Sequence, residues 1–472
     1  MASRLPVPMG VVAETGETRP DLSDASLQAI APEPPFVATR SQRKRGLALE
    51  GAVDDPMKLE QAGWCALFPS DADPAIKEAL KPLLDWRRSQ VNDERFFKVF
   101  EGADGVRPAQ PATTWATNRG VSLVAPVSPR KGVPYYMLIV GPPSRIGFDF
   151  QAQFDLQWAV GRLHFDNVAD YDAYARKVVD YEKGLAPKRR KRLAVWTPRN
   201  PLDMATALLA GSVVPEFLGQ VSPGDDPIGK ASGFDVSTFV GDGQATKSRL
   251  IDIVRGTVDG GPPALLFTGS HGAEWSIENP PIQRERQGAL VTQEWSRGQP
   301  LAADHYFAGS DVTADANVHG LIMFMFACFG GGCPATDSYY FDNNGARLTL
   351  SPEPLVARLP QALLSRGTLA IIAHIDRAFS YAFEDVMGTP QAQLLRTPLE
   401  LLAKGRRVGL AADPMNLQWS ALAAQLGMAL DSGRGGEPPR GPLIANLYIA
   451  RDDARNYVVL GDPAARLRVE EM

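Results

Sequence analysis

Two apolar runs that stop at glycine constrain the fold of this chain more than any other feature. The first spans residues 264–272 and ends at His271-Gly272, and the second spans residues 319–332, with Cys328 just before its glycines. Short apolar runs bounded by turn residues are typical of strands buried on both faces, as in the centre of a parallel sheet. We therefore expect two central strands with His271 and Cys328 at their tips, where the catalytic groups of such sheets gather.

Strand-like and helix-like segments alternate along most of the chain, which is the pattern of an α/β fold. Apolar runs of strand length occur at residues 62–69, 134–143, 158–163, 192–200, 234–240, 367–379, 444–449 and 456–463. Helical patterns lie at residues 73–84, 168–184, 203–214, 241–253 and 390–404. The basic stretch 185–192 predicts a linker between two tandem α/β subdomains, 56–190 and 191–472, the second closing with a C-terminal segment.

Composition narrows the classes of function. A net charge of −5 over 472 residues gives no reason to expect nucleic acid as a partner. Three cysteines in so long a chain argue against a disulfide framework and fit a reducing compartment. No run approaches the about 18 apolar residues of a membrane helix, and the start of the sequence lacks the apolar core of a signal peptide. We expect a cytoplasmic protein without a membrane span.

Residues 1–55 differ from the rest, because they are rich in Pro, Ala, Ser and charged residues and have no sustained period. This composition predicts a flexible or loosely docked N-terminal segment.

A thiol and an imidazole at neighbouring strand ends make a nucleophile and its base. Because a free thiol is only a few per cent thiolate at neutral pH, Cys328 needs His271 to take its proton and later give it to a leaving amine. The N–H groups of Gly272 and Cys328 are the expected donors to an oxyanion. This set suits acyl transfer on a peptide bond and requires no cofactor. The alternatives are simple core packing, a metal site built from Cys328, Cys333 and His319, and a reversible disulfide between the two cysteines.

The same residues resemble a known group of enzymes. Ser270-His271-Gly272 and Ala327-Cys328 look like the catalytic dyad of the caspase-like clan of cysteine proteases, and within it the gingipain-like family (peptidase family C25) is the closer match. Four further segments resemble that family in their order and spacing: 136–141, 159–163 with the helix that follows, 367–372 and 461–467.

The resemblance implies a caspase-like three-layer sandwich with a mainly parallel sheet. It also implies an endopeptidase that acts on polypeptides through a thioester on Cys328. Because the start of the sequence shows no signal peptide, we expect this activity inside the cell, with a regulatory protein as a further partner. The chain departs from the family in two respects. Known members are secreted with a signal peptide, and the loop 330–333 after the cysteine is unusual.

Four residues are candidates for substrate binding. Glu274 and Trp275 follow the histidine and are expected at the rim of the cleft, while Asp376 and Arg377 follow a neighbouring strand. Asp376 would select a basic side chain and Arg377 an acidic one, or the two would form a structural ion pair.

Several alternatives remain open at this point. The residue that orients His271 is Asp235, Asp242 or Glu274. Residues 1–55 form an inhibitory or docking segment under the protease hypothesis. A protease-like scaffold without turnover and a transpeptidase with the same dyad are the competing functions.

Overall fold

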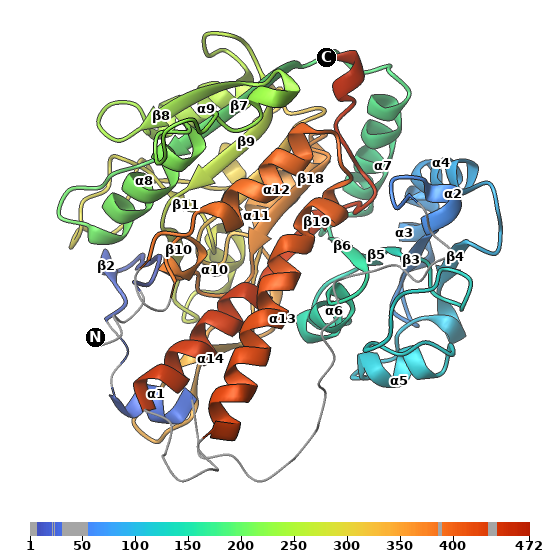
Figure 1. Cartoon of the computed structure of the whole chain (residues 1–472), viewed down its shortest axis with the longest axis horizontal. Helices are drawn as coiled ribbons and strands as arrows, with labels where there is room; N and C mark the ends of the chain where they lie inside the picture. Colours follow the sequence, from blue (N-terminus) through green and yellow to red (C-terminus); the bar gives the residue numbers. More distant parts are fainter. Residues whose placement is uncertain (1–6, 21, 23, 31–54, 386–388, 433–440) are drawn as a thin grey trace.

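A computed structural model describes residues 7–20, 22, 24–30, 55–385, 389–432 and 441–472 (Figure 1). Its centre is one sheet, whose strands run in the order β4 (Phe97–Phe100), β3 (Trp64–Leu67), β5 (Tyr136–Val140), β6 (Ala159–Leu163), β19 (Tyr457–Gly461), β18 (Ala370–His374), β13 (Ile322–Phe326), β9 (Pro263–Gly269), β7 (Arg190–Thr197) and β8 (Asp235–Val240). Every described pair of neighbours is parallel except β18 and β19. The sheet is therefore mainly parallel, as the sequence predicts.

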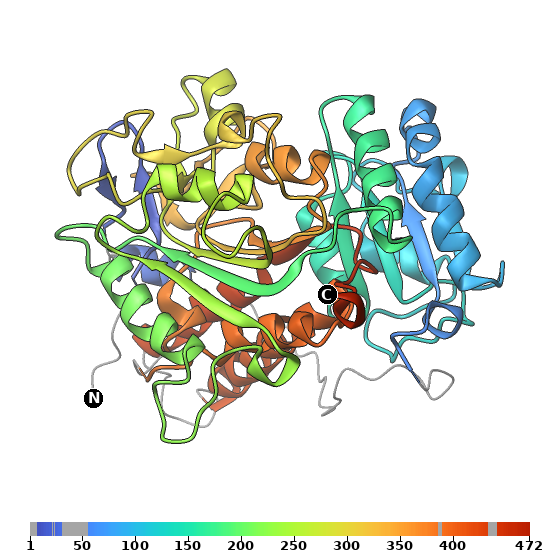
Figure 2. The same ribbon diagram turned by 90° about the horizontal axis from the view of Figure 1, so that it is seen from above.

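Helices cover both faces of this sheet, which Figure 2 shows edge-on. One layer holds α3 (Pro74–Ala79), α4 (Lys81–Val91), α7 (Val168–Glu182), α10 (Pro280–Arg286) and α11 (Arg358–Ser365). The other holds α8 (Met204–Phe217), α12 (Gln393–Ala403), α13 (Val408–Ser432) and α14 (Gly441–Arg455). The other described α-helices are α1 (Asp24–Ile30), α2 (Leu59–Ala62), α5 (Ala112–Thr117), α6 (Phe148–Asp155) and α9 (Lys247–Arg255). The chain thus has the three-layer α/β sandwich expected from the caspase-like resemblance.

The central strands are buried because their side chains are apolar on both faces. Every residue of β5, β13 and β18 is buried, and these strands belong to one hydrophobic core that extends across the whole sheet. Near-continuous runs of Ile, Leu, Met and Phe are typical of strands that are buried on both faces of the sheet. Strands with one face in solvent alternate apolar and polar residues instead. The core therefore fixes β9 and β13 side by side, and with them the residues at their ends.

The two predicted subdomains, 56–190 and 191–472, contribute to the same sheet. β19 comes from the end of the chain but pairs in parallel with β6 and antiparallel with β18. This strand is therefore the seam at which the strand direction reverses. The division of the chain at residue 190 remains a prediction.

A second, smaller sheet lies at the carboxyl end of β9. It runs β12 (Tyr306–Phe307), β11 (Leu290–Val291), β10 (Gly272–Glu274), β1 (Gly10–Val12) and β2 (Glu17–Thr18). Two antiparallel pairs complete the described strands, β14 (Gly332–Cys333) with β17 (Leu355–Val356) and β15 (Thr336–Phe341) with β16 (Arg347–Thr349).

Two expectations differ from the structure. Residues 7–20 and 24–30 do not form the flexible segment expected for 1–55, because β1 and β2 join the small sheet and α1 packs against α14 and β15. Residues 31–54 of that segment lie outside the described residues. The run 444–449 was expected to be a strand and is helical, part of α14. Six apolar residues are too few for the helical period to be told from a strand.

Among the described residues, no helix is both long enough and apolar enough to cross a membrane.

Candidate active site

The candidate site lies where β9 and β13 end. The two strands are parallel neighbours, and their last paired residues are Gly269 and Phe326. His271 lies two residues after Gly269, and Cys328 lies two residues after Phe326. The Ser270 N–H donates to the Phe326 carbonyl at 3.1 Å and continues the pairing to the strand ends. The sheet register therefore brings the two predicted catalytic residues to one place.

His271 is oriented by a carboxylate that the sequence did not single out for this role. The imidazole Nε2 lies 2.9 Å from Asp203 Oδ2, and both side chains are almost fully buried. The ring also stands edge-on to Trp295, with the ring centroids 5.6 Å apart. Within the described part of the chain, Nδ1 has no hydrogen-bond partner. An Nε2–H donor to Asp203 leaves Nδ1 as the nitrogen that is able to exchange a proton.

Asp203 is itself held firmly, because it caps the N-terminus of α8. Its Oδ2 accepts from the Thr206 N–H at 2.9 Å and from the Thr206 hydroxyl at 2.6 Å. Burial raises the pKa of Asp203, but the charge and hydrogen bond of His271 and the two bonds from Thr206 outweigh it and hold the pKa well below its ordinary value. The carboxylate is therefore ionised and faces His271.

The three residues proposed from sequence for this role do not contact His271. Asp235 and Asp242 are exposed at β8 and the turn after it. Glu274 is paired with two arginines instead. In the sequence, Asp203 could be recognised only as the start of a helix, because Asp is a preferred residue just before the first helical turn. Nothing in the sequence linked it to His271.

Cys328 is fully buried, and its thiol is engaged by backbone. The Ala378 N–H donates to Sγ at 3.1 Å, and Sγ also lies 3.6 Å from the Ala378 carbonyl oxygen. Burial raises the pKa of this thiol, and the nearby Arg377 only partly opposes that effect. The raised pKa favours the protonated thiol, and no hydrogen bond joins Sγ to His271 in the described part of the chain.

The backbone around Cys328 is tightly constrained. Phe329, the next residue, has φ of 57°, in the left-handed region that non-glycine residues rarely adopt and that recurs at active sites. A Cβ on Gly272 would lie 1.8 Å from the Cys328 carbonyl oxygen, so only glycine fits there. The strand after His271 and the turn at Cys328 are thereby in direct backbone contact.

The two predicted oxyanion donors differ in their hydrogen bonds. The Gly272 N–H donates at 3.2 Å to a main-chain carbonyl of the N-terminal segment, that of Met9. The Cys328 N–H has no hydrogen-bond partner among the described residues. A carbonyl next to Cys328 is thus already bound by one of the two donors.

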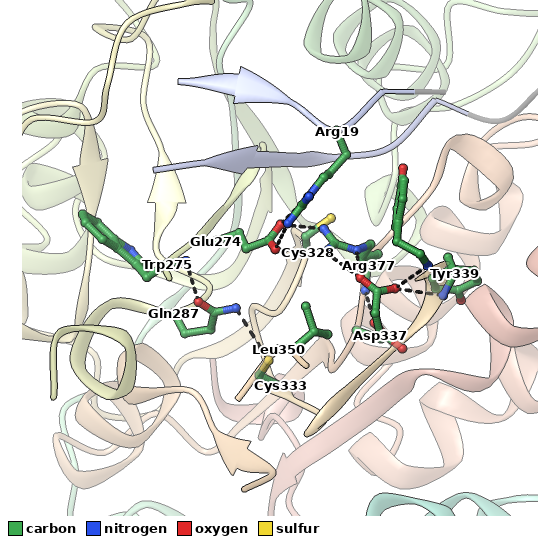
Figure 3. A network of polar contacts seen from close by, with 12 residues as sticks. Arg19, Glu274, Trp275, Gln287, Cys328, Cys333, Asp337, Tyr339, Leu350 and Arg377 are labelled. Carbon is green, nitrogen blue, oxygen red and sulfur yellow. Dashed lines mark hydrogen bonds and ion pairs between the residues drawn. The ribbon is translucent and has the colours of Figure 1, made fainter. Parts of the chain in front are cut away.

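Two of the four predicted substrate-binding residues, Glu274 and Arg377, belong to a buried charge network (Figure 3). Arg377 donates to both oxygens of Glu274, at 2.7 and 2.9 Å, and to Asp337 at 2.8 Å. Arg19 donates to the same Glu274 at 2.6 and 3.2 Å. Asp376 does not pair with Arg377 as an ion pair; it accepts from Ser338 and from the Arg377 backbone N–H. Arg377 therefore has its charge balanced by two carboxylates and is not free to select an acidic substrate.

Glu274 and Trp275 lie apart from Asp376. The first two line a cavity of about 400 Å³ together with Arg19, whereas Asp376 lines a separate cavity of about 440 Å³ beside β15. The Trp275 ring stands edge-on to Tyr306, and the Trp275 backbone N–H donates to the Gln287 side-chain oxygen at 2.8 Å. Burial and the neighbouring Asp337 raise the pKa of Asp376 to about 6. The four residues do not form one pocket.

The three cysteines are free thiols, and Cys333 receives a hydrogen bond from Gln287 at 3.6 Å. The metal-site alternative finds no support in the described residues, in which no three His, Cys, Asp or Glu side chains are grouped to hold an ion.

No family model matches this chain, and no curated protein matches it either. Among solved structures, one described as "Structure of Protease" is similar, with 13% sequence identity and a TM-score of 0.46 over 86% of this chain and 78% of that chain. The name belongs to that protein alone.

Proposed function

We propose that this chain is a cysteine endopeptidase of the caspase-like kind, with Cys328 as nucleophile and His271 as acid and base. The observation that carries the proposal is the pairing of two strand ends: a thiol follows β13, and an imidazole already oriented by a buried carboxylate follows the adjacent β9. Nucleophile, base and orienting group are the three parts that thiol-based acyl transfer needs.

The proposed proton transfers follow from which atoms of His271 and Cys328 are already hydrogen-bonded. Asp203 holds Nε2 of the imidazole, so Nδ1 is the atom that accepts the thiol proton and returns it to the leaving amine. Because burial holds the thiol in its protonated form, activation requires the groups that cover Cys328 to move. The N–H groups of Gly272 and Cys328 then stabilise the oxyanion, an effect typically worth about 10²–10³ in rate for one donor.

The same proposal includes a family, a cellular compartment, a substrate class and the residues at the cleft rim. The order of the strand ends supports the gingipain-like family within the clan, and three free thiols support a reducing, intracellular compartment. Polypeptides are the proposed substrates, with a regulatory protein as a further partner. Glu274 and Trp275 are assigned to the cleft rim, on the cavity that they line with Arg19.

A test is cleavage of a mixed-sequence peptide library, resolved by mass. The full chain is compared with Cys328→Ala and with Cys333→Ala, a matched control because both thiols are fully buried and five positions apart. We expect cleavage by the wild type and by Cys333→Ala, and none by Cys328→Ala. Equal cleavage by Cys328→Ala rejects the assignment, and transfer of the acyl group to an added amine in place of water identifies a transpeptidase.

One observation favours the second candidate, a protease-like scaffold without turnover. The thiol and the imidazole are both fully buried, and each is bonded to another group. A scaffold predicts that no library peptide is cleaved, and that His271→Ala and Cys328→Ala leave the binding of a protein partner unchanged.

A further inference from the structure

The N-terminal segment crosses the candidate site as an extended strand. Before Gly10 it runs antiparallel to the loop after β18: the Met9 N–H donates to the Ala378 carbonyl at 3.0 Å, and the Ser380 N–H donates to the Val7 carbonyl at 3.1 Å. Pro8 lies opposite Phe379 between these two bonds. The backbone nitrogen of Pro8 points away from the loop, so the N–H that proline lacks removes no hydrogen bond between the two segments. A peptide held by alternate main-chain bonds against a strand edge is bound as proteases bind substrates.

After Met9 the segment changes neighbours. Gly10, Val11 and Val12 of β1 pair in parallel with Gly272, Ala273 and Glu274 of β10, the strand that follows His271. The Ala13 N–H donates to the Glu274 carbonyl at 2.8 Å. The switch between the two partners falls at the bond between Met9 and Gly10, which therefore lies between the loop next to Cys328 and the strand next to His271.

The Met9–Gly10 peptide group has one contact with the strand after His271 and one with Cys328. On one side the Met9 carbonyl accepts from the Gly272 N–H at 3.2 Å, the donor predicted for the oxyanion. On the other side, a Cβ built on Gly10 would lie 3.2 Å from Cys328 Sγ, so the thiol is in contact with this residue. The carbonyl is thus bound by the oxyanion donor while the nucleophile lies beside the same peptide.

The side chains on either side of this bond differ in size. Met9 is fully buried and belongs to the main hydrophobic core. A Cβ on Gly10 would lie 3.2 Å from Cys328 Sγ, a tight contact that favours glycine at this position. The site accordingly holds a flexible apolar side chain before the bond and the smallest residue after it.

Contacts further along fix this register. Arg19 forms a bidentate pair with Glu274, and the Tyr340 hydroxyl donates to the Pro20 carbonyl at 2.9 Å. The Leu301 N–H donates to the Ala13 carbonyl, and the Ser276 N–H donates to the Glu14 carboxylate. Because both ends of the crossing are anchored, the bond presented to Cys328 is a fixed one.

We propose that Met9–Gly10 is the bond that this site cleaves in its own chain, and that polypeptides in which glycine follows an apolar residue without branching at Cβ are its substrate class. The inference rests on the proposed endopeptidase function. Cys328 Sγ attacks the Met9 carbonyl carbon, the C–N bond to Gly10 breaks, and the thiol proton passes through His271 to the Gly10 amine. Water then attacks the thioester, the S–C bond breaks, and the products are a Met9 carboxylate, a chain that begins at Gly10, and the free thiol.

The test reads the N-terminus of the purified full chain by sequencing and intact mass. We expect a new N-terminus at Gly10 in the wild type and in Met9→Leu, and at least tenfold less of it in Cys328→Ala and Met9→Glu. A synthetic peptide of residues 5–14, added to the wild type, is expected to be cut between methionine and glycine. This second arm does not depend on how the Met9 variants fold.

The outcomes separate the two proposals. If library peptides are cleaved through Cys328 but neither the chain nor the peptide is cut at Met9–Gly10, the endopeptidase stands and the inference falls. A cut at another bond, or equal cutting of Met9→Glu, also overturns the inference. If the wild type cleaves nothing, both fall.

Discussion

Asp203 Oδ2 lies 2.9 Å from His271 Nε2, although 68 positions separate the two residues in the sequence. The pair fixes which imidazole nitrogen is free, and Asp203 is at the same time the N-cap of α8. Asn is an equally good cap residue but carries no charge, so Asp203→Asn isolates the electrostatic role. We expect kcat for peptide cleavage to fall by about 10²–10⁴ with KM little changed, in line with the effect of the corresponding change in other triads.

The control for this prediction is Asp235→Asn. Asp235 was one of the sequence candidates and is exposed in β8. Its substitution is expected to leave kcat and KM unchanged, and thermal unfolding of both variants checks that the fold is intact. An Asp203→Asn enzyme with full activity would remove the orienting role of this carboxylate.

Gly272 is predicted to tolerate no side chain. The Cβ of Gly272→Ala would meet the Cys328 carbonyl oxygen at 1.8 Å and force the two strand ends apart. We expect at least a 10²-fold loss of activity through the displaced oxyanion donor, together with lowered thermal stability. The matched control is Gly211→Ala in α8, where an added Cβ meets nothing within 4 Å. An alanine in a helix interior is expected to raise stability by up to about 1 kcal/mol.

Arg19 is predicted to hold the N-terminal segment over Cys328. Loss of its partly buried bidentate pair in Arg19→Ala costs about 1–2 kcal/mol, which raises the population of the open segment roughly 5- to 30-fold. The measurement is the rate of Cys328 alkylation by iodoacetamide, read by peptide mapping in a His271→Ala background that keeps the segment uncut. Arg297→Ala is the control, since Arg297 pairs with Glu17 of the same segment at 3.5 Å but on the exposed surface. Equal rates in the two variants would contradict the anchoring role.

Glu274 is predicted to make stability depend on acid pH. Burial raises the pKa of Glu274, but Arg377 and Arg19 outweigh it and hold the pKa at about 2. Because this lies below the value of about 4.3 in an unfolded chain, the stabilisation is fully present above that value and is lost as pH falls toward 2. The shift corresponds to about 3 kcal/mol, of which about 2 kcal/mol is gone by pH 3.

The free energy of unfolding in urea, measured for wild type and Glu274→Gln at pH 7, 4 and 3, checks this. The gap between the two proteins is expected to narrow as the pH falls. Glu353→Gln, which removes an exposed pair with Arg284, serves as the control and is expected to show no pH-dependent gap. A gap for Glu274→Gln that is the same at all three pH values would contradict the prediction.

The strands that carry the site were predictable because an apolar run can be recognised in the sequence without knowing which strands lie beside it. The runs before His271 and Cys328 are buried strands in the sheet, side by side, as expected. Asp203 was recognised only as a helix start, because its contact with His271 depends on how α8 packs on the sheet. The pairing of Arg377 with Glu274 and Asp337 joins segments far apart in the sequence in the same way.

The N-terminal segment escaped prediction for a different reason. It is held through main-chain groups of Val7, Met9 and Ala13, and backbone hydrogen bonds leave no periodic pattern in the side chains. A stretch with prolines and glycines but no period therefore looked loose, although the structure places it directly on the thiol. The run 444–449 shows the opposite case, where a pattern was present but too short to distinguish a helix from a strand.

Covalent labelling of Cys328 tests the central claim most directly. A mixture of peptidyl acyloxymethyl ketones with varied final residues, which transfer the peptide to a catalytic thiol, is added to the native full chain, and labelled sites are mapped by mass spectrometry. The account predicts label on Cys328 that disappears in His271→Ala, with Cys65 and Cys333 unlabelled. Absence of label on Cys328, or labelling that is unchanged in His271→Ala, would contradict it.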